Sequence, residues 1–305
     1  MTKTSLTRRI LPLLAVSVLG LTACGSSSVV SSPSDAFTVN GKGYSKDDLN
    51  ALIDVLVEAG QLTKQNGTVA KTDVTPVIQV MVKYEAYLQF IKKYNLTETA
   101  ANRAKVTEQA SADENFPNYP KPLQDLLVNL NLAALTTAGM KVPSSSDLEK
   151  MYNTMPASTG VLCLSHILVK TKAEADKVLS EIDRGAKFAD VAKAKSIEPA
   201  AKTSGGSLAN GEEPCNPLAS LQESFDGDFM VGAVAAKAGV ASGPVKSSIG
   251  WHIILSHPFS EVKGSIANVL KENTGDSLLA GYMASSDITV NSAYGTWNGA
   301  TAKIS

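Results

Sequence analysis

Apolar residues recur every three to four positions through most of residues 45–156, which is the pattern of amphipathic helices. This spacing and the capping residues predict helices that begin near residues 45, 75, 97, 123 and 146. A short apolar stretch at residues 37–39 predicts a strand before them, and residues 65–72 have the composition of a polar loop. This half of the chain is therefore expected to be mainly α-helical.

The pattern changes after residue 157. Residues 161–169 and 251–255 are rich in strand-forming residues, residues 174–195 predict two helices, and residues 205–217 are dense in turn residues. A helical pattern returns at residues 265–283, and a short strand at 288–290 precedes an irregular tail. We therefore predict an α/β module inserted between two helical stretches, which together form one discontinuous domain.

The N-terminus has the pattern of a secretory signal. Basic residues precede an apolar run at residues 10–21, which is too short to span a bilayer. The run ends in Leu-Thr-Ala-Cys, which resembles the bacterial lipobox and implies cleavage before Cys24 and lipid on its thiol. A plain signal peptide with an incidental cysteine is the alternative. The Ser-rich residues that follow are typical of a flexible tether, so we expect an extracytoplasmic protein held at a membrane by its lipid.

Composition excludes some functions. The net charge is −1, so no basic surplus would attract nucleic acid. Once Cys24 is lipidated, only Cys163 and Cys215 remain, and an even pair in an oxidising compartment predicts one disulfide. Two buried free thiols are the alternative. The remaining cysteines and the three histidines match no metal-ligand spacing, so neither a metal nor another cofactor is expected.

Two histidines lie in the middle of apolar strands. His166 lies in Leu-Ser-His-Ile-Leu-Val, and His252 lies in Trp-His-Ile-Ile. Alternation along a strand places each ring on one face among apolar neighbours. A buried imidazole needs a hydrogen-bond partner, and each ring is the most economical partner for the other. We therefore predict that the two rings meet across neighbouring strands; the alternative is two half-exposed rings without a role.

Five short blocks give these histidines a specific context. They are residues 166–169, 187–192, 205–208, 242–245 and 250–254. In order and spacing they resemble the parvulin family of peptidyl-prolyl isomerases over residues 161–258. The surrounding layout resembles extracytoplasmic foldases and chaperones of the PrsA and SurA type, in which both ends of the chain build a helical chaperone domain that carries a parvulin insert.

This resemblance implies an α+β fold. A discontinuous helical domain, similar to the N-terminal domain of SurA, would carry a parvulin-like domain built on a four-stranded antiparallel sheet with surrounding helices. The expected boundaries are 1–23 for the signal peptide, 24–36 for the tether, 37–156 and 262–297 for the chaperone domain, 160–258 for the inserted domain and 298–305 for the tail.

The resemblance also implies catalytic residues. His166 and His252 match the two central histidines of the parvulin fold, which polarise the hydrogen-bond network of the active site. Glu198 falls where the family has a Cys or Asp beside the substrate amide. Ser247 falls near a hydroxyl of the same network. No nucleophile is required, because proline isomerisation makes and breaks no covalent bond.

Three further positions match apolar residues that hold the proline ring in the family: Leu208, Leu221 and Phe225. The chain departs from the family pattern at Ser207, Ala209 and Ile249, and the usual proline-bearing run before the pocket Phe reads Gln222-Glu223-Ser224. The Arg-rich insert of phosphate-reading parvulins is absent after the first strand of the inserted module, so strict phosphopeptide specificity is not expected.

The expected function is thus isomerisation of X-Pro bonds in newly secreted or unfolded polypeptides near a membrane surface. The departures keep a second hypothesis open, in which the chain is a holdase with the same fold and little or no isomerase activity. A third hypothesis, a solute-capturing lipoprotein, agrees with the lipid anchor but not with the inserted module.

Overall fold

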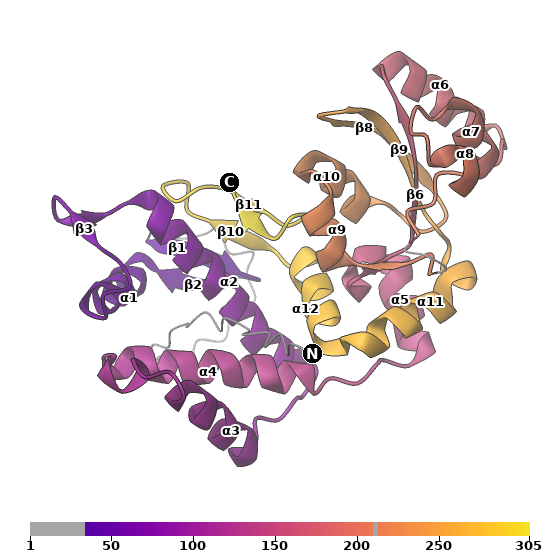
Figure 1. The fold of residues 1–305 in the computed structure, drawn as a ribbon. Coiled ribbons are helices and arrows are strands. Elements are labelled where there is room, and N and C mark those ends of the chain that lie inside the picture. Colours follow the sequence, from indigo (N-terminus) through magenta and orange to yellow (C-terminus); the bar gives the residue numbers. More distant parts are fainter. Residues whose placement is uncertain (1–33, 210–212) are drawn as a thin grey trace, which may run out of the picture.

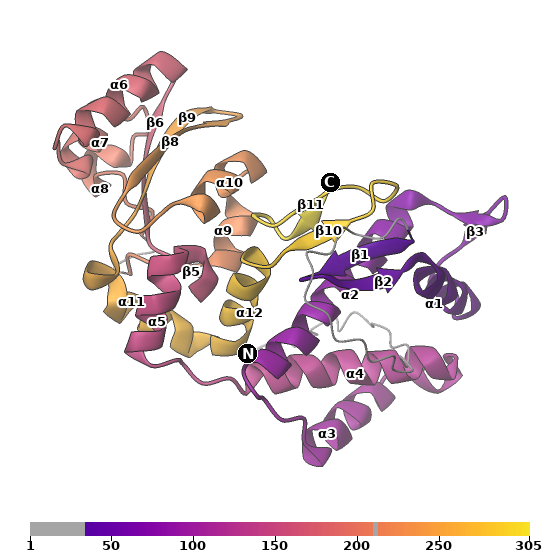
Figure 2. The same cartoon turned by 180° about the vertical axis from the view of Figure 1, so that it is seen from behind.

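The computed structural model describes residues 34–209 and 213–305, and Figures 1 and 2 show it from opposite sides. The predicted signal peptide, Cys24 and the tether up to residue 33 lie outside the described residues. The last two residues assigned to the tether, Asp35 and Ala36, already belong to the first strand. Within the described part, no helix combines the length and apolar character that a membrane span requires.

The two ends of the described chain meet in one small sheet. Strand β1 (Asp35–Val39) pairs antiparallel with β2 (Lys42–Ser45) on one side and with β10 (Ile288–Val290) on the other. The turn between β1 and β2 is Asn40–Gly41, with positive φ at both residues, and Asn-Gly is the pair that favours such a hairpin turn. Figure 1 shows β10 in yellow beside β1 in indigo. The helical domain is therefore discontinuous, as predicted.

Seven helices pack around this sheet or extend from it: α1 (Lys46–Glu58), α2 (Lys71–Lys93), α3 (Ala100–Ser111), α4 (Lys121–Ala138), α5 (Ser145–Thr154), α11 (Phe259–Glu272) and α12 (Thr274–Ala284). The backbone N–H of Asp48 donates to Ser45 Oγ at 3.0 Å, which caps α1 as predicted. Side chains such as Phe90, Leu126 and Leu278 lie in one buried cluster, so residues from both ends of the chain share one core.

The inserted domain is built on an antiparallel sheet with the order β6 (Leu164–Val169), β9 (Gly250–Ser256) and β8 (Ala241–Ser247). A short segment extends it at the free edge of β6. His166 N–H donates to Gly206 O at 2.8 Å, and Leu208 N–H donates to Leu164 O at 2.9 Å. Residues 206–208 thus take the place of a fourth strand.

The two faces of this sheet carry different helices (Figure 1). Ile167 and Val169 pack on one face against α6 (Lys172–Asp183) and α7 (Phe188–Lys195), and the short α8 (Ala201–Ser204) follows α7. Leu164 packs on the other face against α9 (Leu218–Ser224) and α10 (Gly227–Ala235). The alternation of β6 therefore places His166 toward α10.

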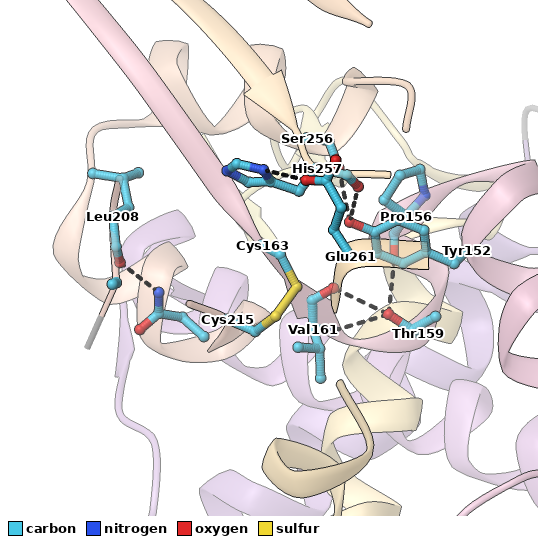
Figure 3. Close-up of a disulfide and its surroundings, with 12 residues drawn as sticks. Tyr152, Pro156, Thr159, Val161, Cys163, Leu208, Cys215, Ser256, His257 and Glu261 are labelled. Carbon is cyan, nitrogen blue, oxygen red and sulfur yellow. Dashed lines mark hydrogen bonds and ion pairs between the residues drawn. A yellow bond between two sulfur atoms is a disulfide. The ribbon is translucent and has the colours of Figure 1, made fainter. Parts of the chain in front are cut away.

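A disulfide joins two segments of the inserted domain, as Figure 3 shows. The predicted pair Cys163–Cys215 is bonded, and both residues are buried. The flanking strands β5 (Val161–Leu162) and β7 (Asn216–Pro217) pair with each other. Asn216 Nδ2 donates to Leu208 O at 2.7 Å, so the same segment holds the short fourth strand.

Tyr152 on α5 connects the inserted domain to the helical domain (Figure 3). Its hydroxyl donates to His257 O at 2.8 Å and lies 3.1 Å from Ser256 Oγ. Its ring lies 5.7 Å from that of Phe259 at the start of α11. The end of β9 is therefore anchored to two helices of the other domain.

Several helix boundaries differ from those predicted. Helix α2 begins at Lys71, because Val74 continues the apolar face of Ile78 and Met81 by one turn, and Pro76 lies inside the helix. Helix α5 is capped by Ser144, whose Oγ accepts from Asp147 N–H, and not by the predicted Ser146. The 3₁₀ turns Phe116–Asn118 and Pro156–Thr159 precede α4 and β5, respectively.

The predicted helix at 265–283 is two helices that meet at Asn273 and begin at Phe259, directly after Pro258. The break lets the start of α12 approach α4: a Cβ at Gly275 would lie only 2.1 Å from Thr137 O. The expected loop at 65–72 contains a hairpin of β3 (Lys64–Gln65) and β4 (Thr68–Val69). The expected irregular tail contains another, β11 (Trp297–Asn298) with β12 (Lys303–Ile304).

Candidate active site

Four polar side chains form a continuous hydrogen-bonded row on the α10 side of the sheet. His166 Nε2 lies 2.6 Å from Glu198 Oε2, and His166 Nδ1 lies 3.1 Å from His252 Nδ1. His252 Nε2 lies 2.7 Å from Ser247 Oγ. The two imidazole planes are inclined by only 12°. The structure thus brings together all four residues that the resemblance implied as catalytic.

Strand register produces this row. In the antiparallel pairing of β6 with β9, His166 is opposite Ile254 and Leu168 is opposite His252. The two histidines are therefore diagonal neighbours on one face, within reach of each other's ring. Glu198 is fixed at the far end because the N–H of Ile197 donates to Leu168 O at 2.8 Å.

Burial controls the charge of this row. The two histidines are each 2% exposed and Ser247 is 5% exposed, whereas the side chain of Glu198 is 37% exposed. Burial, followed by the proximity of His166, lowers the pKa of His252 to about 4. His252 is therefore neutral at neutral pH, and Glu198 is the solvent-accessible end of the row.

One arrangement of hydrogen-bond donors and acceptors satisfies the whole row. His166 Nε2–H donates to the Glu198 carboxylate, which leaves His166 Nδ1 as an acceptor for His252 Nδ1–H. Ser247 Oγ–H then donates to His252 Nε2, and Ser247 Oγ accepts from Ile249 N–H at 3.3 Å. Every donor points toward Glu198, so the row is polarised in one direction.

Aromatic rings close the row on the α10 side. The Phe229 ring meets both imidazoles edge to face, at 5.7 Å from His166 and 5.0 Å from His252. Phe225 stacks on Phe229 at 4.6 Å. Phe225 and Leu208 are half-buried members of the same apolar cluster, whereas Leu221 is only 5% exposed. Leu208 and Phe225 therefore have surface left for a ligand, and Leu221 has little.

The sequence analysis missed Phe229, although the sequence carries a signal for it. Leu221, Phe225 and Phe229 recur at intervals of four, but Phe225 and Asp226 have extended backbone between α9 and α10, so the three residues do not lie on one helix. Asp226 is a good N-cap residue, and it begins α10 so that Phe229 lies in the first turn. The cap predicts where α10 begins, whereas the contact of Phe229 with the imidazoles depends on how α10 crosses the sheet.

The positions that depart from the parvulin pattern have defined environments. Ser207 Oγ accepts from Ala209 N–H at 3.2 Å, so a hydroxyl stabilises the turn after the double glycine. Ile249 lies in the turn between β8 and β9 and is 66% exposed. Its side chain presents apolar surface next to the Ser247 end of the row.

Comparisons with known proteins agree with this geometry. Residues 166–257 match the family described as rotamase, PPIC-type PPIase domain. The foldase protein PrsA of Clostridium kluyveri is 33% identical over 211 residues, which cover 64% of this chain and 59% of that protein. PrsA of Caldanaerobacter subterraneus subsp. tengcongensis is 31% identical over 201 residues, which cover 64% of this chain and 61% of that protein.

Among solved structures, PrsA from Bacillus subtilis is 21% identical, with 83% of this chain and 92% of that chain covered and a TM-score of 0.29. The chain spans 59–61% of the length of the two curated relatives described above. The hydrogen-bonded row lies within residues 166–257, the part of the chain that matches the domain family. Residues 166–257 are therefore similar to the PPIC-type PPIase domain family, and the chain that carries them has foldase protein PrsA among its relatives.

Proposed function

We propose that this chain catalyses cis–trans isomerisation of X-Pro bonds in polypeptides outside the cytoplasm. The observation that carries the proposal is the hydrogen-bonded row Glu198–His166–His252–Ser247, buried except at Glu198, which lies beside half-buried apolar side chains inside the PPIC-type domain. A polar row under an apolar surface is what binding of a proline ring and its amide requires.

The reaction sets the chemical requirements. Rotation about an X-Pro amide must overcome a resonance barrier of about 18–20 kcal/mol and takes tens to hundreds of seconds unaided. A catalyst must bind the twisted amide more tightly than either planar form. In the twisted amide, the nitrogen is more basic and the carbonyl oxygen carries less negative charge. Surroundings that favour this charge distribution lower the barrier.

The residues of the row supply such surroundings. Leu208 and Phe225 would hold the proline ring on apolar surface. The Glu198 carboxylate, at the exposed end of the row, would disfavour the planar form when it lies near the carbonyl oxygen, because that form has the more negative oxygen. The two imidazoles hold Glu198 and Ser247 in place through hydrogen bonds.

The proposed location follows from the N-terminal segment. Lipid on Cys24 would hold the chain at a membrane, where it would meet newly secreted polypeptides. The relatives carry the name foldase protein, which agrees with unfolded polypeptides as substrates.

A second candidate function is binding of unfolded segments by the helical domain. One groove between this domain and α9 of the inserted domain has a volume of about 700 Å³, and its wall is formed by α2, α4, α9, α12 and the C-terminal hairpin. Its apolar lining includes Tyr87, Leu135, Leu279, Met283 and Trp297. Suppression of aggregation by a variant that lacks isomerase activity would separate this function from catalysis.

A protease-coupled proline-peptide assay on the chain from Gly25 onward tests the proposed function. Wild type should exceed the uncatalysed rate, and His252→Ala and Glu198→Gln should each lower kcat/KM at least about tenfold, which is 1.4 kcal/mol. His257→Gln is the matched control, since His257 bonds Ser165 and lies outside the row. Circular dichroism would confirm that the variants fold. A wild-type rate equal to the uncatalysed rate would reject the proposal.

A further inference from the structure

We propose that Asp226 is a positioning residue of this active site, because its carboxylate ties α10 to the turn between β8 and β9. These two segments carry Phe229 and Ser247, which contact the imidazole pair from different sides. The inference rests on the proposed function, and its tests distinguish the two.

The first contact fixes the helix. Asp226 is the N-cap of α10, and its Oδ1 accepts from Phe229 N–H at 2.8 Å. The bond holds the backbone of the residue whose ring meets both His166 and His252. An N-cap of this kind stabilises the start of a helix. Here it also sets where the aromatic ring lies against the row.

The second contact fixes the turn. Asp226 Oδ2 accepts from Ser248 Oγ–H at 3.2 Å. Ser248 lies between Ser247, which bonds His252, and the exposed Ile249. One carboxylate thus bonds to both segments that border His252.

The consequence is a fixed distance between the start of α10 and the turn between β8 and β9, in addition to the packing of α10 on β8 near Gly232 and Val245. The α10 side supplies the aromatic contact and the turn supplies the hydroxyl, and His252 lies between them. Catalysis by a preorganised site is sensitive to displacements of about 1 Å, which can lower a rate about a hundredfold. Loss of the tie should therefore slow the reaction more than it weakens binding.

Three variants test this in the proline-peptide assay on the chain from Gly25. Asp226→Ala removes both contacts and should lower kcat at least about tenfold, with a small change in KM. Ser248→Ala removes only the turn contact and should give a smaller loss. Asp226→Asn keeps an acceptor for Phe229 N–H and a polar group for Ser248, so it should recover most of the rate lost in the alanine variant.

The matched control is Ser144→Ala, which removes the N-cap of α5, a helix of the other domain, at a similar cost in stability. Its kcat should remain that of wild type. If Asp226→Ala behaves like this control at the same folded fraction, the inference is wrong.

An NMR measurement separates the inference from the proposed function. The ring resonances of Phe229 and His252 should shift in Asp226→Ala and stay unchanged in Ser144→Ala. If the ring resonances of Phe229 and His252 do not change in Asp226→Ala, the inference that Asp226 positions these rings is wrong, even if the enzyme is active. Shifted resonances in a protein whose wild type is inactive would support the tie and reject the proposed function.

Discussion

His252 carries no charge at neutral pH in the folded protein because its ring is buried and a second imidazole lies beside it. His252 forms hydrogen bonds to His166 through Nδ1 and to Ser247 through Nε2, so both nitrogens of its neutral ring have partners. The lowered pKa of His252 therefore affects the stability of the protein as well as its active site.

Acid should destabilise the protein through this residue. An unfolded histidine has a pKa near 6.5, whereas folding lowers that of His252 to about 4. Between these values the unfolded chain binds the extra proton, so the free energy of unfolding falls as the pH decreases from 6.5 to 4, by about 3 kcal/mol. Urea unfolding of wild type and His252→Gln across this range measures the difference. If the free energy of unfolding depends on pH equally in both proteins, the lowered pKa does not belong to His252.

The pairing of the histidines could be predicted from local sequence. Strand alternation indicates which face of the sheet each ring lies on, and a buried imidazole needs a hydrogen-bond partner. Phe229 could not be found in the same way, since its contact with the imidazoles depends on how α10 crosses the sheet. Ser144 rather than Ser146 caps α5, although each can accept the bond, because a helix starts where the whole segment packs.

At the scale of elements, the disulfide joins two strands whose own pairing is very short. β5 and β7 share two residue pairs, and the Cys163–Cys215 bond closes a loop with a sequence separation of 52. That loop contains α6, α7, α8 and the segment with Leu208. The bond therefore restricts the unfolded state of about half of the inserted domain.

Removal of this disulfide should cost about 2–4 kcal/mol. The double variant Cys163→Ser/Cys215→Ser should show this loss in urea unfolding, with the rate of isomerisation also reduced because Asn216 holds Leu208. A reducing agent should lower the stability of wild type by a similar amount and leave the double variant unchanged. Equal stability of wild type and variant would show that the bond is dispensable.

Most elements could be predicted from periodicity and caps, but their junctions could not. The break at Asn273 is imposed by the contact of α12 with the end of α4, a contact between residues far apart in sequence. The hairpin β11–β12 joins segments of only two residues, which carry too few positions to show a period of two.

At the scale of the molecule, the C-terminal hairpin connects the two domains. Trp297 packs against the core of the helical domain, whereas Ala300 is buried in the core of the inserted domain beside α9. Gln222 Nε2 on α9 donates to Ala300 O at 2.9 Å. Figures 1 and 2 both show β11 between the two domains. The tail is therefore part of the support for the helix that leads to Phe225.

Truncation after Tyr294 should lower the free energy of unfolding by about 1–3 kcal/mol, because it exposes apolar surface and removes the hydrogen bond to Gln222. Hydrogen exchange should increase in α9 and α10 but not in α6, which lies on the other face of the sheet. Gln222→Ala removes only the hydrogen bond and should have a smaller effect. Unchanged exchange in α9 after truncation would refute this role.

The central claim, that the imidazole row belongs to a proline isomerase, is tested most directly by exchange NMR on a proline peptide at equilibrium. Catalytic amounts of the chain from Gly25 should accelerate cis-to-trans and trans-to-cis exchange equally and leave the populations unchanged, and His252→Ala should lose most of this effect. Exchange that stays on the uncatalysed scale of tens to hundreds of seconds with folded wild type would contradict the account.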